Sequence, residues 1–367
     1  VGYGASIAII LAAAVAVGAN PAQTASWVAA VSIATGLGSI GLSSWTRVPM
    51  VLAWSTPGAA LIAASSGIDI HQAAGAFLIA AVLVALTGAI PALNRAIGAI
   101  PAAVAAMLAG VLLPFVMAVA KGAASVPALV LPLILVYFAA RLFSPLYATI
   151  AALGVGLALA ALQPGATLPP LAFDPFPFVW IAPAFDLKVL IGLGLPLYIV
   201  TMASQNLPGF AVLRAHGYAA PVRPALLATG IGSALIAPLG AHTFNMAAIT
   251  AAICMGDDVD PDRTTRWKVG LAYGAIWVLI GVGGTLMLPL IIAMPPEIVA
   301  TVAGLALLTP LIGALAQAFD VATTRLPAAV TFATTASGVA AFGIGAAFWG
   351  LIAGLMVLVL ERARRVN

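Results

Sequence analysis

Two short polar stretches interrupt long apolar runs in a way that could create an anion-binding site. Residues 55–58 read STPG, and residues 242–245 read HTFN. Ser, Thr and Asn are favoured just before a helix, and Pro57 suits a first helical turn because its missing N–H would have no partner there. A helix start presents free N–H groups and about half a positive charge, which attract an anion without Lys or Arg. We therefore predict two helix N-termini, near Pro57 and Asn245, that together hold a small anion.

The residues predicted to line this site surround the two helix starts. They are Ser55, Thr56, Pro57, Gly58 and Ala59 in the first stretch, and Asn245, Met246 and Ala247 in the second. A proline kink in one long helix is the alternative interpretation of the first stretch. Because backbone groups would make the contacts, we expect truncation of the Asn245 side chain to weaken binding only moderately. Added bulk at Gly58 should instead fill the space that the ligand needs.

His242 lies three residues before Asn245 and is the titratable side chain nearest to the predicted site. All ten Asp and Glu residues map to the ends of apolar runs or between them. With a reference pKa of about 6.5, a histidine can take up and release a proton near neutral pH. We predict that His242 carries or gates a proton that accompanies the anion. A buried neutral histidine that bridges backbone groups is the alternative.

The acidic stretch DDVDPD at 257–262 has a spacing at which carboxylates can hold Mg²⁺ or Ca²⁺. Arg263, Arg266 and Lys268 follow directly, which is more typical of a charged loop. The single cysteine, Cys254, excludes an intrachain disulfide and a metal site built from cysteines. We therefore predict no metal, no cofactor and no enzymatic activity. A membrane-embedded magnesium-dependent enzyme that uses 257–262 stays as a weaker alternative.

The elements that position these residues must lie in a membrane. Hydrophobic residues make up 63 % of the chain and charged residues only 7 %, whereas soluble proteins carry about 25 % charged residues. Apolar material extends along the whole length, so the chain is a polytopic membrane protein rather than a soluble domain with a targeting segment. The basic residues are scattered singly, and we predict no nucleic-acid partner.

Eleven charge-free runs are long enough for a crossing helix of about 20 residues, and three of them (1–46, 224–256 and 326–360) must hold two each. This predicts an all-α fold of fourteen spans, with short ones near 50–66, 242–256 and 327–342. If both termini are cytoplasmic, twelve basic residues fall inside and only Lys121 and Lys188 fall outside. The twelve are Arg47, Arg95, Arg141, Arg214, Arg223, Arg263, Arg266, Lys268, Arg325, Arg362, Arg364 and Arg365.

Fourteen spans divide into two sevens, and a second copy with an odd number of spans must insert upside down. Inverted repeats are common in secondary transporters. Residues 57–64 (PGAALIAA) and 245–252 (NMAAITAA) match at four of eight positions with an offset of 188. All four matches are Ala, so their weight comes from position, because each segment is the predicted third span of its seven. The connection 163–187 joins the two halves on the outside.

Three stretches resemble the benzoate:proton symporter (BenE) family: RVPMVLAWSTPGAALIAA at 47–64, PLYIVTMASQNLPGFAVLRAHGY at 196–218 and FNMAAITAAICMGDDVDPDRTTRWKVG at 244–270. That family is similar in architecture to uracil-permease and sulfate-permease transporters. The resemblance implies a seven-plus-seven inverted repeat in which the third and tenth spans are half-helices that follow short extended stretches. It also implies a mobile core domain (1–94 and 185–292), a gate domain (95–184 and 293–367) and a homodimer.

The same resemblance implies a small aromatic carboxylate as substrate and protons as the coupling ion, in a bacterial inner membrane with both termini cytoplasmic. Trp54 and Phe244 lie beside the two helix starts, where a benzene ring would rest, although packing between helices is their alternative role. Ser204, Gln205 and Asn206 are consecutive polar residues at membrane depth, where they are costly unless paired, and are expected to face the site. A passive anion channel is the alternative to a carrier.

Overall fold

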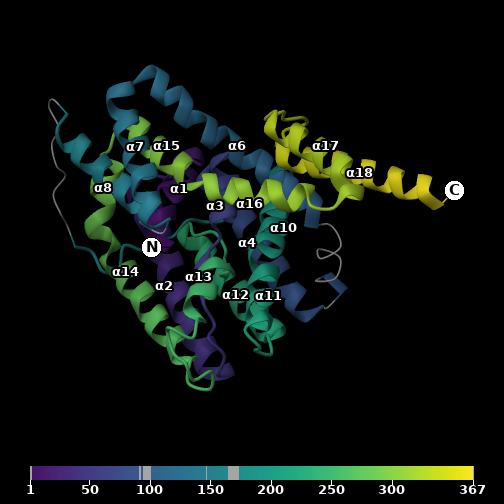
Figure 1. The fold of residues 1–367 in the computed structure, drawn as a ribbon, viewed down its shortest axis with the longest axis horizontal. Coiled ribbons are helices and arrows are strands. Elements are labelled where there is room, and N and C mark those ends of the chain that lie inside the picture. Colours follow the sequence, from purple (N-terminus) through teal and green to yellow (C-terminus); the bar gives the residue numbers. More distant parts are fainter. Residues whose placement is uncertain (1, 91, 94–100, 146, 164–172, 367) are drawn as a thin grey trace.

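A computed structural model describes residues 2–90, 92–93, 101–145, 147–163 and 173–366 of the protein, which are mostly helical (Figure 1). Arg95, the predicted domain boundary at 94/95 and residues 164–172 of the external connection lie outside the described residues. Before the gap at 94–100 the elements are α1 (Gly2–Ala16), α2 (Pro21–Thr46), β1 (Leu52–Trp54), α3 (Thr56–Ala63) and α4 (Ile70–Ala89). They are followed by α6 (Pro101–Ser125), α7 (Pro127–Phe143) and α8 (Ala148–Ala161).

The second half begins with one long helix that contains two π-helical turns: α9 (Leu187–Val189), η1 (Leu190–Gly194), α10 (Leu195–Thr201), η2 (Met202–Asn206) and α11 (Leu207–Ala215). Next come α12 (Val222–Ile236), η3 (Ala237–Leu239), β2 (Phe244–Met246), α13 (Ile249–Cys254) and α14 (Lys268–Ile292). The chain ends with α15 (Pro296–Ala306), α16 (Leu308–Phe319), η4 (Ala322–Thr324), α17 (Arg325–Ala336) and α18 (Ala346–Val366).

Within the described residues, seven helices are long and apolar enough to cross a membrane. Four shorter apolar helices accompany them: Ser6–Ala16, Pro127–Phe143, Ala148–Ala161 and Lys268–Gly284. Helices α3, α13 and α17 have only 8, 6 and 12 residues, in the three regions where the sequence predicts short spans. The chain is thus a membrane protein built mainly from helices. It departs from an all-α fold at the short strands β1 and β2, which are extended stretches that precede α3 and α13.

Local sequence explains where several helices begin. Asn20 and Asp69 form capping boxes with Gln23 and Gln72 at the starts of α2 and α4. In each, the cap side chain accepts from the backbone N–H of the glutamine, and the glutamine side chain accepts from the backbone N–H of the cap residue. Helix α3 starts with Ser55 as its cap and Pro57 in its first turn.

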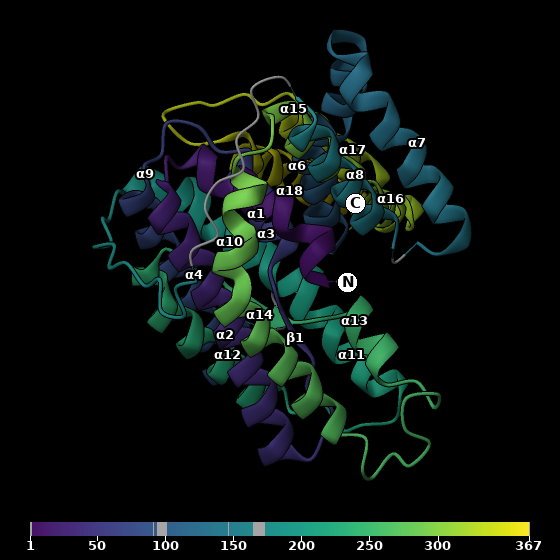
Figure 2. The same ribbon diagram turned by 90° about the vertical axis from the view of Figure 1, so that its left-hand side faces the viewer.

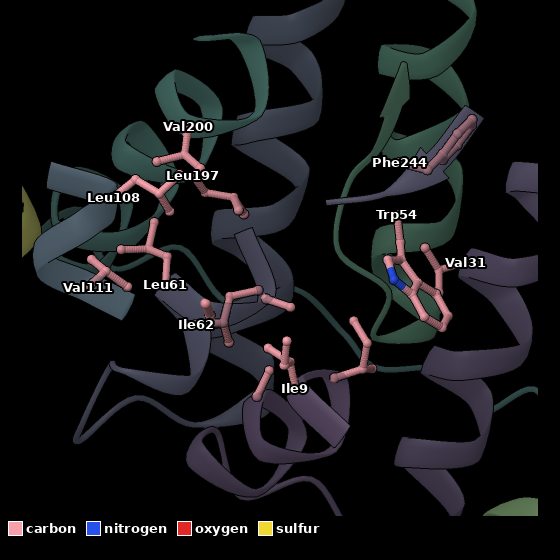
Figure 3. Packing of buried hydrophobic residues seen from close by; sticks show 14 of the residues in the cluster. Ile9, Val31, Trp54, Leu61, Ile62, Leu108, Val111, Leu197, Val200 and Phe244 are labelled. Atoms are coloured by element: carbon pink, nitrogen blue, oxygen red, sulfur yellow. The ribbon is translucent and has the colours of Figure 1, made fainter. Parts of the chain in front are cut away.

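Two groups of helices separate in both views of the molecule. Helices α2, α11, α12, α13 and α14 lie in the lower part, and α6, α7, α15, α16, α17 and α18 lie in the upper part (Figures 1 and 2). Helix α2 packs along α14, and α4 packs along α12. Helix α3 lies at the junction, where Leu61 is near Leu108 of α6 and Leu197 of α10 (Figure 3).

Arginine–aromatic contacts lie at one end of the molecule, and the stretch before α9 lies at the other. At one end the guanidinium of Arg47 lies 4.1 Å from the ring centre of Trp267, and Arg263 lies over Tyr218. At the other end the stretch before α9 folds over the helices, because Ala184 N–H donates to the carbonyl of His71 (2.8 Å). Arg47 and Arg263 are two of the twelve basic residues that the charge bias predicts to be cytoplasmic.

Candidate binding site

The chain crosses itself in the interior at strands β1 and β2. The two strands pair antiparallel, with Leu52 opposite Met246, Ala53 opposite Asn245 and Trp54 opposite Phe244. The pairing continues on both sides, since Ser55 N–H donates to the Thr243 carbonyl (3.0 Å) and Ala247 N–H to the Val51 carbonyl (2.9 Å). Backbone without helical bonds survives at membrane depth only when it is paired inside the protein. The two extended stretches satisfy each other.

Side chains from neighbouring helices satisfy the outer edges of this two-stranded sheet. On β1, Leu52 N–H donates to Ser39 Oγ (3.2 Å), and the Leu52 carbonyl accepts from the Tyr273 hydroxyl (2.7 Å). On β2, Phe244 N–H donates to Ser233 Oγ (3.1 Å), and Met246 N–H donates to Asn206 Oδ1 (3.0 Å). Helices α2 and α14 thus hold one strand, and α12 and η2 hold the other.

The start of α3 is capped by its own chain. Ser55 Oγ accepts from Gly58 N–H (3.1 Å), and the Ser55 carbonyl accepts from Ala59 N–H (2.8 Å). A Cβ at Gly58 would lie 2.6 Å from Leu197 Cδ1 and 2.7 Å from Ser55 Oγ. A larger residue at Gly58 would therefore press on α10 and on the cap, so its effect on binding would report packing rather than occupied ligand space.

The second helix starts later than the sequence predicts. Asn245 lies in β2, and α13 begins at Ile249. The prediction of a helix start near Asn245 is wrong in this respect, because the strand pairing holds Asn245 in extended backbone. Gly58, Ala59, Met246 and Ala247, which the sequence offers as backbone donors to an anion, all donate within the protein.

A cluster of buried hydroxyls joins the two stretches to α10. Thr201 Oγ1 lies 3.3 Å from Ser55 Oγ and 3.0 Å from Thr243 Oγ1, and Thr201 and Ser55 are fully buried while Thr243 is 1 % exposed. One turn earlier on α10, the Tyr198 hydroxyl bonds Thr87 Oγ1 of α4 (2.6 Å). Sequence reasoning missed Thr201 and Thr243, since isolated threonines are common in membrane helices. Only their meeting point identifies them.

His242 bridges two segments that are far apart in the sequence. The indole N–H of Trp27 donates to His242 Nδ1 (2.9 Å), and His242 Nε2 lies 3.1 Å from the carbonyl oxygen of Ser55. A neutral imidazole that carries its proton on Nε2 satisfies both contacts. A second proton would have to go on Nδ1, where it would displace the Trp27 indole. The predicted proton-coupling role of His242 therefore requires that Trp27 moves away.

Asn245 is the one predicted site residue whose side chain is buried without a partner among the described residues. The residue is fully buried, and neither Nδ2 nor Oδ1 has a hydrogen-bond partner. Residues directly opposite each other in a ladder project to the same face, so Asn245 shares a face with Ala53. Leu52, Trp54, Phe244 and Met246 project to the other face, and all four are buried, whereas Ala53 is partly exposed.

Trp54 and Phe244, which are predicted to stack on a ligand, pack against neighbouring helices and not against each other. Trp54 lies in an aromatic cluster, with ring centres 5.3 Å from Tyr3 and 5.0 Å from Trp277, and its indole N–H donates to Ser6 Oγ (2.7 Å). A Cβ on Gly38 or Gly232 would contact the ring of Phe244. Figure 3 shows Trp54 beside Val31 of α2, with Phe244 on the neighbouring strand.

The polar stretch 204–206 occupies the second π-helical turn, η2. Ser204 Oγ donates to the Val200 carbonyl (2.5 Å). The Asn206 amide accepts from Met246 N–H in β2 and donates to Met202 Sδ (3.4 Å). Gln205 is partly exposed. Asn206 therefore positions β2, because its carbonyl oxygen occupies the outer edge of that strand.

The acidic stretch 257–262 forms part of a closed loop between α13 and α14. The guanidinium of Arg266 is nearly fully buried and donates to the carbonyls of Met255 (2.6 Å) and Asp260 (2.7 Å) and to the Asp257 carboxylate (2.7 Å). Bonds from the Thr264 hydroxyl and backbone N–H lower the pKa of Asp262. No three His, Cys, Asp or Glu side chains in the described part of the chain group as a metal site. The stretch therefore binds Arg266, which closes the loop and also bonds the carbonyl of Met255 at the end of α13.

A family model described as benzoate membrane transport protein (BenE) matches residues 1–360 of the chain. The chain is 38 % identical to inner membrane protein YdcO of Escherichia coli, over 99 % of this chain and 95 % of that protein. It is 33 % identical to the benzoate membrane transport protein of Acinetobacter baylyi, over 90 % and 84 % of the two lengths. The solved structure of SLC26A9 is similar in fold, with a TM-score of 0.59 and 13 % identity, and the match spans 98 % of this chain and 65 % of that one.

Proposed function

Because this chain belongs to the benzoate membrane transport (BenE) family, we propose that it imports benzoate or a similar small aromatic carboxylate by proton symport. The chain is a membrane transport protein and not an enzyme. One structural observation supports the choice of site: two extended stretches, whose paired residues are 190 to 194 positions apart in the sequence, cross in the interior beside the start of α3. Interrupted helices that meet near the middle of a membrane are the usual substrate sites of secondary transporters.

The substrate would bind at the crossing of β1 and β2. The residues in this proposal are those at the start of α3 (55–59), those of β2 and its flank (244–247), and Trp54. Ser204, Gln205 and Asn206 of η2 lie beside β2 and belong to the same proposed site. Its walls are mostly apolar, which suits a benzene ring, and polar groups are few, as is common in pockets for small ligands.

The proposed architecture is two inverted sevens that form a core domain (1–94 and 185–292) and a gate domain (95–184 and 293–367). Contacts between helices support it. In the proposed repeat, α1, α2, α3 and α4 correspond to α11, α12, α13 and α14, and α7 and α8 correspond to α17 and α18. Each contact in one half then has an equivalent: α2–α14 matches α12–α4, α1–α3 matches α11–α13, and α7–α8 matches α17–α18. Both members of every pair are in contact. Transport would then be a movement of the core domain against the gate domain, in a protein that resides in the inner membrane and forms homodimers.

The transport proposal is tested with purified protein in liposomes. With the outside at pH 6 and the inside at pH 8, labelled benzoate should accumulate inside above its outside concentration, and it should only equilibrate when both sides are at pH 8. Protein-free liposomes must be run in parallel, since uncharged benzoic acid crosses lipid by itself. Protein-dependent uptake that merely equilibrates and follows the membrane potential would identify a passive anion channel and contradict the symport proposal.

The proposed topology is tested by thiol labelling in a Cys254→Ser background. Asp258 and Ser66 are both exposed. The proposed topology puts them in connections on opposite sides of the membrane. We expect a membrane-impermeant maleimide added to intact cells to label Ser66→Cys. Asp258→Cys should be labelled only after the membrane is opened, because the basic loop around it is predicted to be cytoplasmic. Labelling of Asp258→Cys in intact cells would rule out the proposed orientation.

A further inference from the structure

The side-chain amide of Asn245 indicates which protonation state of the substrate this site binds. Both of its polar atoms are fully buried and find no hydrogen-bond partner in the described part of the chain, which is costly unless something pairs with them in the working protein. We propose that the Asn245 amide binds the uncharged carboxylic acid form of the substrate, so that the coupled proton travels on the substrate itself. This inference rests on the proposed transport of an aromatic carboxylate.

The chemistry of the amide selects the protonated form. An amide offers one acceptor, Oδ1, and donors on Nδ2, whichever way it is turned. A carboxylic acid offers one O–H donor and one carbonyl acceptor, so the two groups can form a cyclic pair with two hydrogen bonds. A carboxylate offers only acceptors, and one of its oxygens would face Oδ1 with no proton between them. The neutral acid therefore uses both amide atoms and the anion uses one.

Four backbone N–H groups that the sequence offers to an anion near Asn245 are already used within the protein. Gly58, Ala59, Met246 and Ala247 already donate their backbone N–H groups within the protein. The Asn245 backbone is paired with Ala53, because the neighbouring residues of both strands bond outward to helices. An anion beside the Asn245 amide would thus lose its water without gaining any of these N–H groups, which is unfavourable in a buried site.

Titratable groups near Asn245 are few. The elements that pack against β2 include β1, α2, α12 and η2, and Gly209 of α11 lies against Met246. Among the described residues of these elements, the charged side chains are Arg214 and Arg223. Arg214 is exposed at the end of α11, and Arg223 lies in the first turn of α12, ten residues and about 15 Å along the helix from Ser233. His242, three residues before Asn245, already bonds Trp27 and Ser55 as a neutral ring. Within the described residues of these elements, no carboxylate is available to carry the proton.

The proton balance of the proposed cycle is simple. The carboxylate takes a proton from water on the outside, the acid binds at Asn245, and the acid gives the proton to water on the cytoplasmic side after release. One proton then moves with each carboxylate, and no net charge crosses the membrane. Ala53, which shares the ladder face of Asn245, is partly exposed, so the ligand would approach from that face.

Two ligands that do not titrate separate this proposal from an anion site. Benzamide is an uncharged analogue of benzoic acid with one carbonyl acceptor and N–H donors, and benzenesulfonate stays an anion at every working pH. Purified protein is incubated with labelled benzoate and either competitor between pH 5 and pH 8. The inhibition constant of benzamide should be the same at each pH, and benzenesulfonate should not compete. Competition by benzenesulfonate but not by benzamide would overturn the inference.

The pH dependence of benzoate binding provides a second measurement on the same samples. A carboxylic acid has a pKa of about 4, so its neutral fraction falls about tenfold for each pH unit above that value. The apparent affinity for benzoate should likewise fall about tenfold for each pH unit between pH 5 and pH 8, about a thousandfold in all. A pH-independent affinity would show that the anion is the bound form. Complete absence of benzoate binding would instead count against the proposed function, which distinguishes the two failures.

Asn245→Leu tests the residue directly, with Ser32→Ala as the matched control. Both changes remove a buried polar group that has no partner, and Ser32 lies on α2 against α14. Without ligand, we expect both variants to melt at or above the temperature of the unchanged protein. Asn245→Leu should lose at least about tenfold in affinity for benzamide and for benzoate at pH 5, while Ser32→Ala should keep both affinities. A well-folded Asn245→Leu variant with unchanged affinities would overturn the inference.

Discussion

Replacing Gly274 with leucine is expected to prevent helices α2 and α14 from packing. A Cβ at Gly274 would lie 2.5 Å from the carbonyl oxygen of Gly36, and a Cβ at Gly36 would lie 2.5 Å from that of Gly274. Backbone cannot move aside as a side chain can, so the helices would have to separate. Overpacking of a core typically costs about 1–3 kcal/mol, and we expect Gly274→Leu to exceed that range. Thermal melting and size-exclusion chromatography of the purified variant measure the effect.

The control for this change lies on the same helix. Gly283 is also in α14, and a Cβ there would have no atom within 4 Å. Gly283→Leu should therefore fold, elute and melt like the unchanged protein. Equal behaviour of the two leucine variants would contradict the close approach of α2 and α14. Separation of these helices would also release β1, since Tyr273 of α14 bonds the Leu52 carbonyl.

The second large effect is expected for His242→Leu. This change leaves the buried indole N–H of Trp27 without its acceptor and removes one bond from the Ser55 carbonyl, which keeps Ala59 N–H. A buried donor left unpaired costs about 1–3 kcal/mol. Because His242 and Ser55 hold the stretches before β2 and α3 together, we expect weaker benzoate binding as well as a lower melting temperature.

His242→Gln distinguishes a structural role of this residue from proton coupling. A glutamine amide can accept from Trp27 and donate to Ser55, so the variant should be closer in stability to the unchanged protein than His242→Leu. If the substrate carries the proton, His242→Gln should still accumulate benzoate under a pH gradient. Loss of that accumulation, with benzoate exchange intact, would make His242 the proton carrier, as the sequence predicts, and would count against proton transport on the substrate.

The amino-acid sequence by itself determines that this is a membrane protein, where most of its helices lie and which family it belongs to. The scarcity of charge predicts a membrane protein, and the separate apolar runs predict its helices, because burial in lipid depends on local composition. The Ser55 cap and Pro57 predict the start of α3, because a helix cap involves residues close in sequence. The stretches at 47–64, 196–218 and 244–270 identify the family, which the match over residues 1–360 confirms.

The tertiary structure decides which groups of the site are free. Ser55 meets Thr201 and His242, which are 146 and 187 residues away, and β1 pairs with β2. The strand pairing moves the start of α13 from Asn245 to Ile249 and takes up backbone donors that the sequence alone assigns to a ligand. A polar group is used or left free according to the atoms that surround it, and these come from distant parts of the chain. For that reason the sequence identifies Asn245 as a candidate, and only the fold leaves its amide without a partner.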